Sequence, residues 1–257
     1  MESAAEYWTA KALLDWQVEM GADEAILDAP LNRYDLQDKA SKPAAVAAAP
    51  TPMDDTPVDP VAEARHAAAA AQDLAGLKAA MAAFIHCGLK AGARNLVFSD
   101  GVAGAKVMII GEAPDRDEDR EGRPFSGQAG ALLDRMLDAI DMGRVHAQRP
   151  VYLTNVLPWR PPQNRQPSAG DIEMMLPFLE RHIALAAPEL VILMGNTPCQ
   201  ALLGRDGITR MRGTWAQAAG RPALPMFHPS YLLRTPVAKR EAWADLLALN
   251  AKLKALS

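Results

Sequence analysis

The sequence predicts an α/β fold: a three-layer α/β/α sandwich with a central, mainly parallel four-stranded sheet. Beyond residue 100, short and continuous apolar runs alternate with segments of helical periodicity. Fully apolar strands separated by helices are typical of a parallel sheet covered on both faces. The chain has 257 residues and is 49% hydrophobic but only 5% aromatic, so we expect a large, mostly aliphatic core.

Three segments differ in composition. Residues 1–37 form an acidic extension, in which residues 3–20 show the helical spacing of apolar side chains. Residues 38–61 are rich in Ala and Pro and have little to bury, which predicts a linker. Residues 62–257 carry the α/β pattern and are expected to form the folded domain.

Each element of this domain follows from its own pattern. Four strands are expected at residues 107–110, 151–156, 190–194 and 223–227, where apolar residues dominate. Helices are expected at residues 62–86, 129–142, 171–186, 196–203 and 237–255. In the second of these helices, Leu133, Leu137 and Ile140 fall on one face, as in a helix that packs on a sheet.

Charge and cysteine content narrow the class of protein. The net charge of −4 conceals 4 Lys/Arg against 12 Asp/Glu in residues 1–60, and 9 Lys/Arg against 3 Asp/Glu in residues 201–257. The basic end either meets phosphates or solvates helix faces. No apolar run of 18 residues and no secretory signal occur, so we expect no membrane span. Two cysteines make no disulfide framework, which indicates a cytoplasmic protein.

Polar residues follow each predicted strand. GEAPDRDED begins where the first strand ends, Asn155 lies near the end of the second, Met-Gly-Asn follows the third and His-Pro-Ser follows the fourth. Ligands of open α/β sheets bind at the carboxyl ends of the strands. The four strand ends therefore predict one shared binding crevice.

Four kinds of side chain in this crevice suit chemistry on a flat ring, although each also has a structural reading. Glu112 reads as a turn carboxylate that accepts backbone N–H groups. Glu118 and Asp119 are either solvated charges or a pair that holds and polarises a water molecule beside a reacting carbon. Phe125, in Arg-Pro-Phe-Ser-Gly, is either a loop aromatic that caps the core or a stacking platform.

Asn155 and His228 complete this set. Asn155 is either a structural amide or a reader of the ring. A carboxamide offers one acceptor and one donor, which match the N3–H and O4 edge of uracil and mismatch that of cytosine. His228 is either structural or a donor to an oxygen that acquires negative charge.

Taken together, these motifs resemble the uracil-DNA glycosylase superfamily, and most closely its family 4. The resemblance covers about residues 80–250 and rests on Gly111-Glu112-Ala113-Pro114, Glu118-Asp119, Gly122-Arg123-Pro124-Phe125, Thr154-Asn155-Val156, Arg160-Pro161-Pro162-x-Asn164-Arg165 and His228-Pro229-Ser230. It implies a repair enzyme that flips uracil out of DNA and hydrolyses its N-glycosidic bond, leaving an abasic site for base excision repair.

The resemblance also implies a role for each matched residue. The catalytic residues would be Glu112, Glu118 and His228, and the substrate-binding residues would be Ala113, Phe125 and Asn155. The segment 229–234 would enter DNA as a wedge, with Ser230, Leu232 and Arg234 as its DNA-binding residues.

The sequence departs from the family in its cysteines. Family 4 members usually hold an iron–sulfur cluster with four cysteines, which the match places at Phe84, Cys87, Trp159 and Met175. Only Cys87 remains, and one thiolate is too few for such a cluster. We therefore expect no cofactor and no metal, with the three large apolar residues filling the space of the cluster.

The alternative to an enzyme is a non-catalytic module of the same fold that binds DNA or uracil. In either case the expected partner is uracil-containing DNA, single- or double-stranded, and the protein is expected to be a monomer. The acidic extension is a candidate binding segment for another repair protein. The expected location is the cytoplasm, with association to the nucleoid if the source is bacterial.

Overall fold

The computed structural model describes residues 4–20 and 59–256, and the structural statements below concern these residues. Contacts divide the chain into two units, Met1–Asp55 and Thr56–Ser257. In the first unit, helix α1 (Ala4–Glu19) occupies the region where helical spacing predicts it. The boundary at residue 37 and most of the predicted linker lie outside the described residues, so these divisions stay predictions.

The second unit is built on one six-stranded sheet with the order β1-β3-β2-β4-β6-β5. The strands are β1 (Asp100–Gly101), β2 (Val107–Gly111), β3 (Val151–Asn155), β4 (Leu190–Met194), β5 (Ala216–Ala218) and β6 (Arg221–Met226). The inner four are parallel, as predicted, and the outer two pair antiparallel at the edges. The prediction of only four strands is wrong because β1 and β5, with two and three residues, have no apolar run to mark them.

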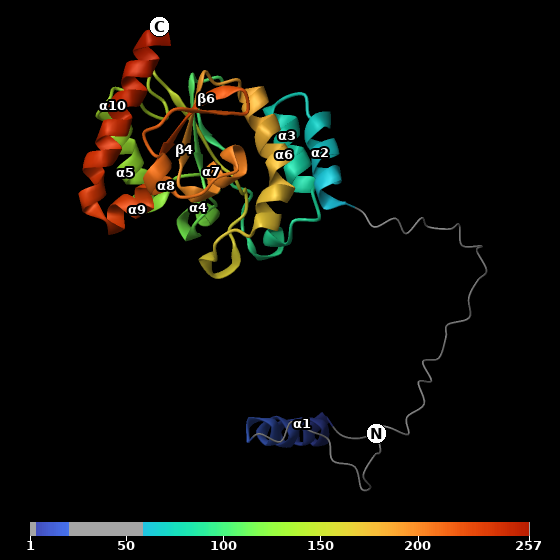
Figure 1. Cartoon of the computed structure of the whole chain (residues 1–257). Helices are drawn as coiled ribbons and strands as arrows, with labels where there is room; N and C mark the ends of the chain where they lie inside the picture. Colours follow the sequence, from blue (N-terminus) through green and yellow to red (C-terminus); the bar gives the residue numbers. More distant parts are fainter. Residues whose placement is uncertain (1–3, 21–58, 257) are drawn as a thin grey trace, which may run out of the picture. The chain divides into compact units, whose positions relative to one another are not determined.

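Alternate residues of the inner strands face two separate apolar clusters, which makes the three layers. Met108 and Ile110 of β2 belong to the cluster formed with α2, α3, α6 and α7. Val107 and Ile109 belong to the cluster formed with α5 and α10. Figure 1 shows these helices on opposite sides of the sheet, with α2 and α3 packed outside α6. The predicted α/β fold class is therefore confirmed.

The helices follow the predicted pattern with local differences. Their bounds are α2 (Pro60–Ala70), α3 (Leu74–Ala83), α4 (Arg116–Glu121), α5 (Gly127–Asp138), α6 (Ala169–Ala186), α7 (Asn196–Leu203), α8 (Ile208–Met211), α9 (Pro229–Arg234) and α10 (Lys239–Leu256), with 3-10 turns η1 (Gly88–Gly92), η2 (Pro162–Asn164) and η3 (Pro236–Ala238). The single helix predicted for residues 62–86 is two helices, because the Asp73 side chain accepts the Gly76 N–H and so caps a new helix.

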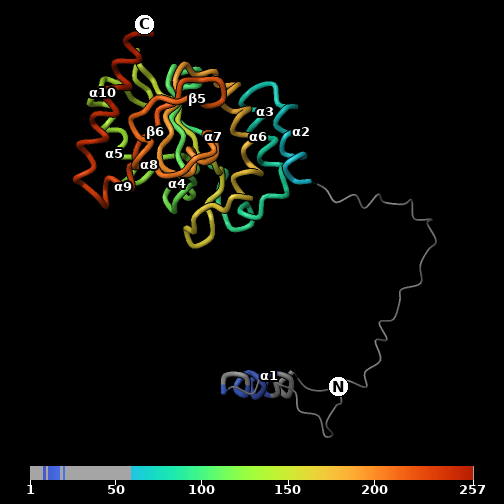
Figure 2. Tube along the Cα trace, viewed as in Figure 1, coloured from blue at the N-terminus to red at the C-terminus, as the bar shows by residue number. Residues whose placement is uncertain are grey.

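The direction of the crossovers between strands reverses at β2. From β2 the chain crosses to β3 on one side and then returns past β2 to β4 on the other. Figure 2 traces this unit, with α10 and α6 on either side of the edge strand β5 and its neighbour β6. Such a switch point opens a crevice at the carboxyl ends of the strands. Within the described residues, no helix is long and apolar enough to cross a bilayer.

Candidate active site

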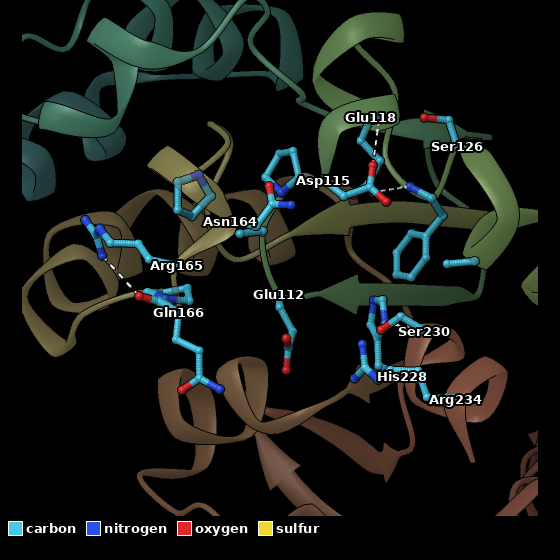
Figure 3. Close-up of a pocket in the computed structure, with 16 residues that line it drawn as sticks. Glu112, Asp115, Glu118, Ser126, Asn164, Arg165, Gln166, His228, Ser230 and Arg234 are labelled. Carbon is cyan, nitrogen blue, oxygen red and sulfur yellow. Dashed lines mark hydrogen bonds between the residues drawn. The ribbon is translucent and has the colours of Figure 1, made fainter.

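A cavity of about 310 Å³ opens at the predicted crevice, next to the end of β2. This volume lies at the lower end of the range for small-molecule pockets, about 300–1,000 Å³, and suits a ligand of modest size. Seven of the nine predicted site residues line it: Glu112, Ala113, Glu118, Phe125, His228, Ser230 and Arg234. Figure 3 shows Glu112, Glu118 and His228 around this cavity, each carried by a different segment.

The run of charges after β2 forms helix α4 and its cap. Asp115 is the N-cap: its Oδ1 accepts the backbone N–H groups of Asp117 and Glu118. Glu118 closes the capping box by accepting the Asp115 N–H at 2.8 Å. Asp119 turns the other way and accepts the Arg94 N–H at 2.8 Å. The predicted pairing of Glu118 with Asp119 around one water is therefore wrong, because Asp119 fixes a neighbouring loop.

Glu118 is buried and joins the two predicted ring-binding residues. Its Oε1 accepts a hydrogen bond from the backbone N–H of Phe125 and another, at 3.3 Å, from Nδ2 of Asn155. Burial raises the pKa of Glu118 from 4.5 to about 7, although these hydrogen bonds oppose the shift. Both carboxylate oxygens are thus engaged in positioning neighbours.

Gly111, the last residue of β2, makes room for the same pair. It lies opposite Asn155 in the parallel register of β2 and β3. A Cβ placed at Gly111 would lie 2.3 Å from Oδ1 of Asn155 and 2.7 Å from Cζ of Phe125. The glycine of the Gly-Glu-Ala-Pro turn is therefore needed for close packing of the amide and the ring.

Glu112 is held by the amino end of helix α7. Its Oε1 accepts the N–H groups of Asn196 at 3.0 Å and Thr197 at 3.4 Å. Burial raises the pKa of Glu112, and these two N–H groups counteract the rise. Both hydrogen bonds described for this carboxylate use Oε1, so Oε2 keeps its capacity to accept a proton or a hydrogen bond.

His228 presents a neutral imidazole to the cavity. Its Nδ1 accepts the backbone N–H of Ser230 at 3.2 Å, which leaves the proton on Nε2. Burial lowers the pKa of His228 to about 4, so the ring is neutral at pH 7. The ring stacks against Phe125, with centroids 5.5 Å apart and planes inclined by 24°.

Two predicted site residues are not in the cavity wall. Asn155 is buried next to Glu118 without lining the cavity. Leu232 has 0% exposure and packs with Phe227, Ala238 and Ala242, so its assignment to DNA contact is wrong in this conformation. The next residue, Leu233, is 42% exposed and is the apolar side chain that α9 presents outward.

Other parts of the wall carry no assignment from the sequence. The segment from Pro161 to Pro167 supplies one side of the cavity, including Asn164, Arg165 and Gln166. This segment overlaps the Arg160-Pro161-Pro162-x-Asn164-Arg165 motif of the family resemblance, which carried no role in the site. Gly195, which precedes α7, belongs to the predicted Met-Gly-Asn strand end, but its close approach to Glu112 leaves no signal in the sequence.

Fold and cavity together define an α/β protein with carboxylates, an imidazole and an aromatic ring around one cavity at the switch point of its sheet. Comparison with known proteins agrees with this class. The family model of the uracil DNA glycosylase superfamily matches residues 98–247. This chain therefore belongs to the uracil-DNA glycosylase superfamily.

Three curated relatives are named type-4 uracil-DNA glycosylases. That of Sulfurisphaera tokodaii is 35% identical over 151 residues, covering 55% of this chain and 67% of the relative. That of Thermotoga maritima is 34% identical, covering 58% and 77%. That of Pyrobaculum aerophilum is 35% identical, covering 62% and 84%. These matches confirm the resemblance to family 4.

The same matches contradict the prediction that this protein has no cofactor. Its relatives are type-4 enzymes, the family in which an iron–sulfur cluster is expected, and none of the matches supports its loss. The apolar replacements were therefore insufficient grounds for that prediction. Phe84, Cys87, Trp159 and Met175 do lie in one buried cluster. They supply a single thiol, which does not fit a four-thiolate site.

Proposed function

We propose that this protein is a repair glycosylase that excises uracil from DNA. The observation that carries the proposal is the joint placement of a carboxylate, a neutral imidazole and a ring at the cavity, with a buried carboxamide directly beside it. Membership of the uracil-DNA glycosylase superfamily supports uracil as the base that enters this cavity. Because a base inside a duplex is out of reach, the nucleotide must leave the stack to enter the cavity.

Asn155 and Phe125 are assigned to recognition of the base. Glu118 accepts from Nδ2 of Asn155, and this contact favours one orientation of the amide, because a carboxylate facing Oδ1 would be repelled. In that orientation Oδ1 accepts the uracil N3–H, and the second Nδ2 proton donates to O4. Phe125 supplies the aromatic surface for stacking, which is worth about 1–3 kcal/mol per base.

Glu112 and His228 are assigned to the bond-breaking step. The bond between N1 of uracil and C1′ of deoxyribose breaks, and its electron pair leaves with the base. Water adds to C1′, and Glu112 accepts the water proton. Nε2–H of His228 donates to O2 of uracil, where the negative charge develops. The products are an abasic sugar and uracil, which regains a proton at nitrogen.

Glu118 is assigned to positioning in place of proton transfer. Its two oxygens already accept from three groups, of Asp115, Phe125 and Asn155. Water activation by Glu118 would require at least one of these hydrogen bonds to break. Ala113 lines the cavity beside Glu112 and is assigned to backbone contact with the substrate.

DNA contact is assigned to α9 and the loop before it. Ser230 and Arg234 line the cavity mouth, and the guanidinium of Arg234 can meet a phosphate on either single- or double-stranded DNA. Leu233 takes the wedge role first given to Leu232, because its side chain is exposed.

Base release from an oligonucleotide with one uracil tests this function. The full-length protein should release uracil, detected by alkaline scission at that position. Glu112→Gln keeps an oxygen for the α7 N–H groups but cannot accept the proton, so its rate should fall about 10²–10⁴-fold. Equal rates for both proteins would remove Glu112 from the chemistry. DNA binding without release by the unmodified protein would favour a non-catalytic module.

Three further properties are proposed with this function. The protein acts as a monomer in the cytoplasm, associated with the nucleoid if its source is bacterial. The acidic extension, residues 1–37, binds another repair protein. Sedimentation at micromolar concentration tests the first property, fractionation of cells the second, and pull-down with and without residues 1–37 the third.

A further inference from the structure

Phe125 has an unusual backbone conformation for an aromatic residue. Its φ is +53°, in the left-handed region that bulky side chains rarely adopt. Such a conformation costs about 1–3 kcal/mol and persists only where the surroundings enforce it. The groups that enforce it therefore decide where the ring lies.

The N–H and the C=O of Phe125 are held from two directions. The N–H donates to Oε1 of Glu118, as described above. The carbonyl accepts a hydrogen bond from Nη2 of Arg144, and the preceding carbonyl, of Pro124, accepts one from Nη1 at 3.0 Å. One guanidinium therefore donates to two successive carbonyls from a rigid, planar fork, whereas a lysine ammonium is a single point of charge on a flexible stem and does not hold its donors in that geometry.

Arg144 is itself fixed by two carboxylates. Its Nη1 lies 2.5 Å from Oδ2 of Asp100 in β1, and its Nε lies 2.8 Å from Oδ1 of Asp134 in α5. The side chain is only 17% exposed. An anchored, mostly buried guanidinium is a rigid support for the Phe125 loop.

Helix α5 is shaped to admit this contact. A Cβ placed at Gly130 would lie 1.6 Å from the Phe125 carbonyl oxygen and 3.2 Å from Nη2 of Arg144. Any larger residue would push the loop off the helix. The loop, the helix and the guanidinium thus form one close-packed unit.

We propose that Arg144 is a positioning residue of the active site, which holds Phe125 in its left-handed conformation and so keeps the ring against His228. This inference rests on the proposed function, because it assigns the ring to the base. Arg144 is not among the described residues that line the cavity, so it acts only through the loop.

Arg149 offers a matched control within the same connection between α5 and β3. It is also partly buried, and it donates to the Ile140 carbonyl at 2.8 Å and to Oδ1 of Asn250 at 2.8 Å. Its loss should disturb the fold without touching Phe125. Arg144→Gln, Arg144→Lys and Arg149→Gln can therefore be compared below their melting temperatures.

The readouts are kcat and KM on a single-uracil oligonucleotide, and equilibrium dialysis of free uracil. We expect Arg144→Gln to lower kcat about 10–100-fold and to weaken uracil binding, since a shift of about 1 Å at a reacting centre costs about 10²-fold. Arg144→Lys should recover only part of the loss. Arg149→Gln should keep kcat and uracil affinity within about twofold.

Equal kcat and uracil affinity for Arg144→Gln and Arg149→Gln would overturn the proposal. A crystal structure of Arg144→Gln with Phe125 still at positive φ and still stacked on His228 would also overturn it. If Arg144→Gln does not fold, Arg144→Lys is the test. Full activity of Arg144→Lys would contradict the proposal that the guanidinium hydrogen bonds to the Pro124 and Phe125 carbonyls position the ring. Absence of uracil release by the unmodified protein would instead refute the proposed function.

Discussion

The carboxylate of Glu118 accepts a hydrogen bond from the side-chain amide of Asn155, at 3.3 Å, in a buried position beside the cavity. A carboxylate can accept but not donate when ionised, so this contact selects the amide orientation with Nδ2 toward Glu118. Glu118 also accepts the Phe125 N–H. One buried acid therefore fixes both the orientation of the Asn155 amide and the position of the Phe125 backbone.

Asn155→Asp should weaken uracil release and loosen discrimination against cytosine. The new carboxylate has no donor for uracil O4, and it would lie next to Glu118, so the pair would repel or retain a proton. The loss of the donor should cost about 1–3 kcal/mol, or roughly 10–100-fold in kcat/KM. Parallel release assays on uracil- and cytosine-containing oligonucleotides measure both effects.

Asn164→Asp is the matched control for this substitution. Asn164 also lines the cavity, but its Oδ1 accepts from Nε of Arg160 at 2.8 Å, a contact that aspartate would keep. Uracil release by this variant should stay close to that of the unmodified protein. Unchanged uracil release by Asn155→Asp, with cytosine still untouched, would show that Asn155 is not the reader.

Uracil release should rise as the pH increases through about 7. Burial raises the pKa of Glu118 to about 7, and the ionised form is the one that accepts from Asp115, Phe125 and Asn155 together. Glu118→Gln should be slower at high pH and should lack this step. A pH profile of kcat/KM for the two proteins, at constant ionic strength, is the measurement.

The same pKa predicts the opposite trend in stability. Between pH 4.5 and about 7 the unfolded chain has released the Glu118 proton while the folded protein retains it, so the free energy of unfolding falls as the pH rises. The stability that Glu118 contributes in its protonated form is fully present below pH 4.5 and is lost as the pH rises above about 7. Urea unfolding at pH 5 and pH 8 measures this change. The free energy of unfolding should decrease less between the two pH values in Glu118→Gln than in the unmodified protein, and an identical decrease would contradict the shifted pKa.

Sequence patterns predicted the strands and the residues that follow them, because a buried parallel strand leaves a local signal and the chain must turn where it ends. Glu112, Phe125 and His228 were found in this way. Arg144 and the close approach of Gly195 to Glu112 leave no such signal, because both depend on contacts with residues distant in sequence. Leu232 and Leu233 were confused since only the packing of α9 decides which leucine is buried.

The two leucines should respond differently to truncation. Leu232→Ala removes a fully buried side chain from the cluster with Phe227 and Ala242, so it should cost about 2–5 kcal/mol of stability. Leu233→Ala should leave stability nearly unchanged and weaken activity on duplex DNA more than on single strands, where no gap needs filling. Urea denaturation and paired kcat/KM measurements separate the effects, and equal losses on both substrates would remove Leu233 from the wedge role.

Gly195→Ala should displace Glu112 and so reduce both activity and stability. Gly195 has a φ of +102°, and a Cβ there would lie 2.3 Å from Oε1 of Glu112. The carboxylate would have to leave the α7 N–H groups, since those are fixed in a helix. We expect a decrease in kcat of at least about 10-fold and a loss of about 1–3 kcal/mol in stability.

Gly204→Ala separates backbone strain from the loss of Glu112 placement. Gly204 ends the same helix with a φ of +63°, and nothing lies within 4 Å of a Cβ placed there. Both variants therefore strain the backbone beside α7, but only Gly195→Ala reaches the carboxylate. An equal fall of kcat in both variants would show that backbone strain at α7 causes the loss. A fall in Gly195→Ala alone would support positioning of Glu112 by the amino end of α7.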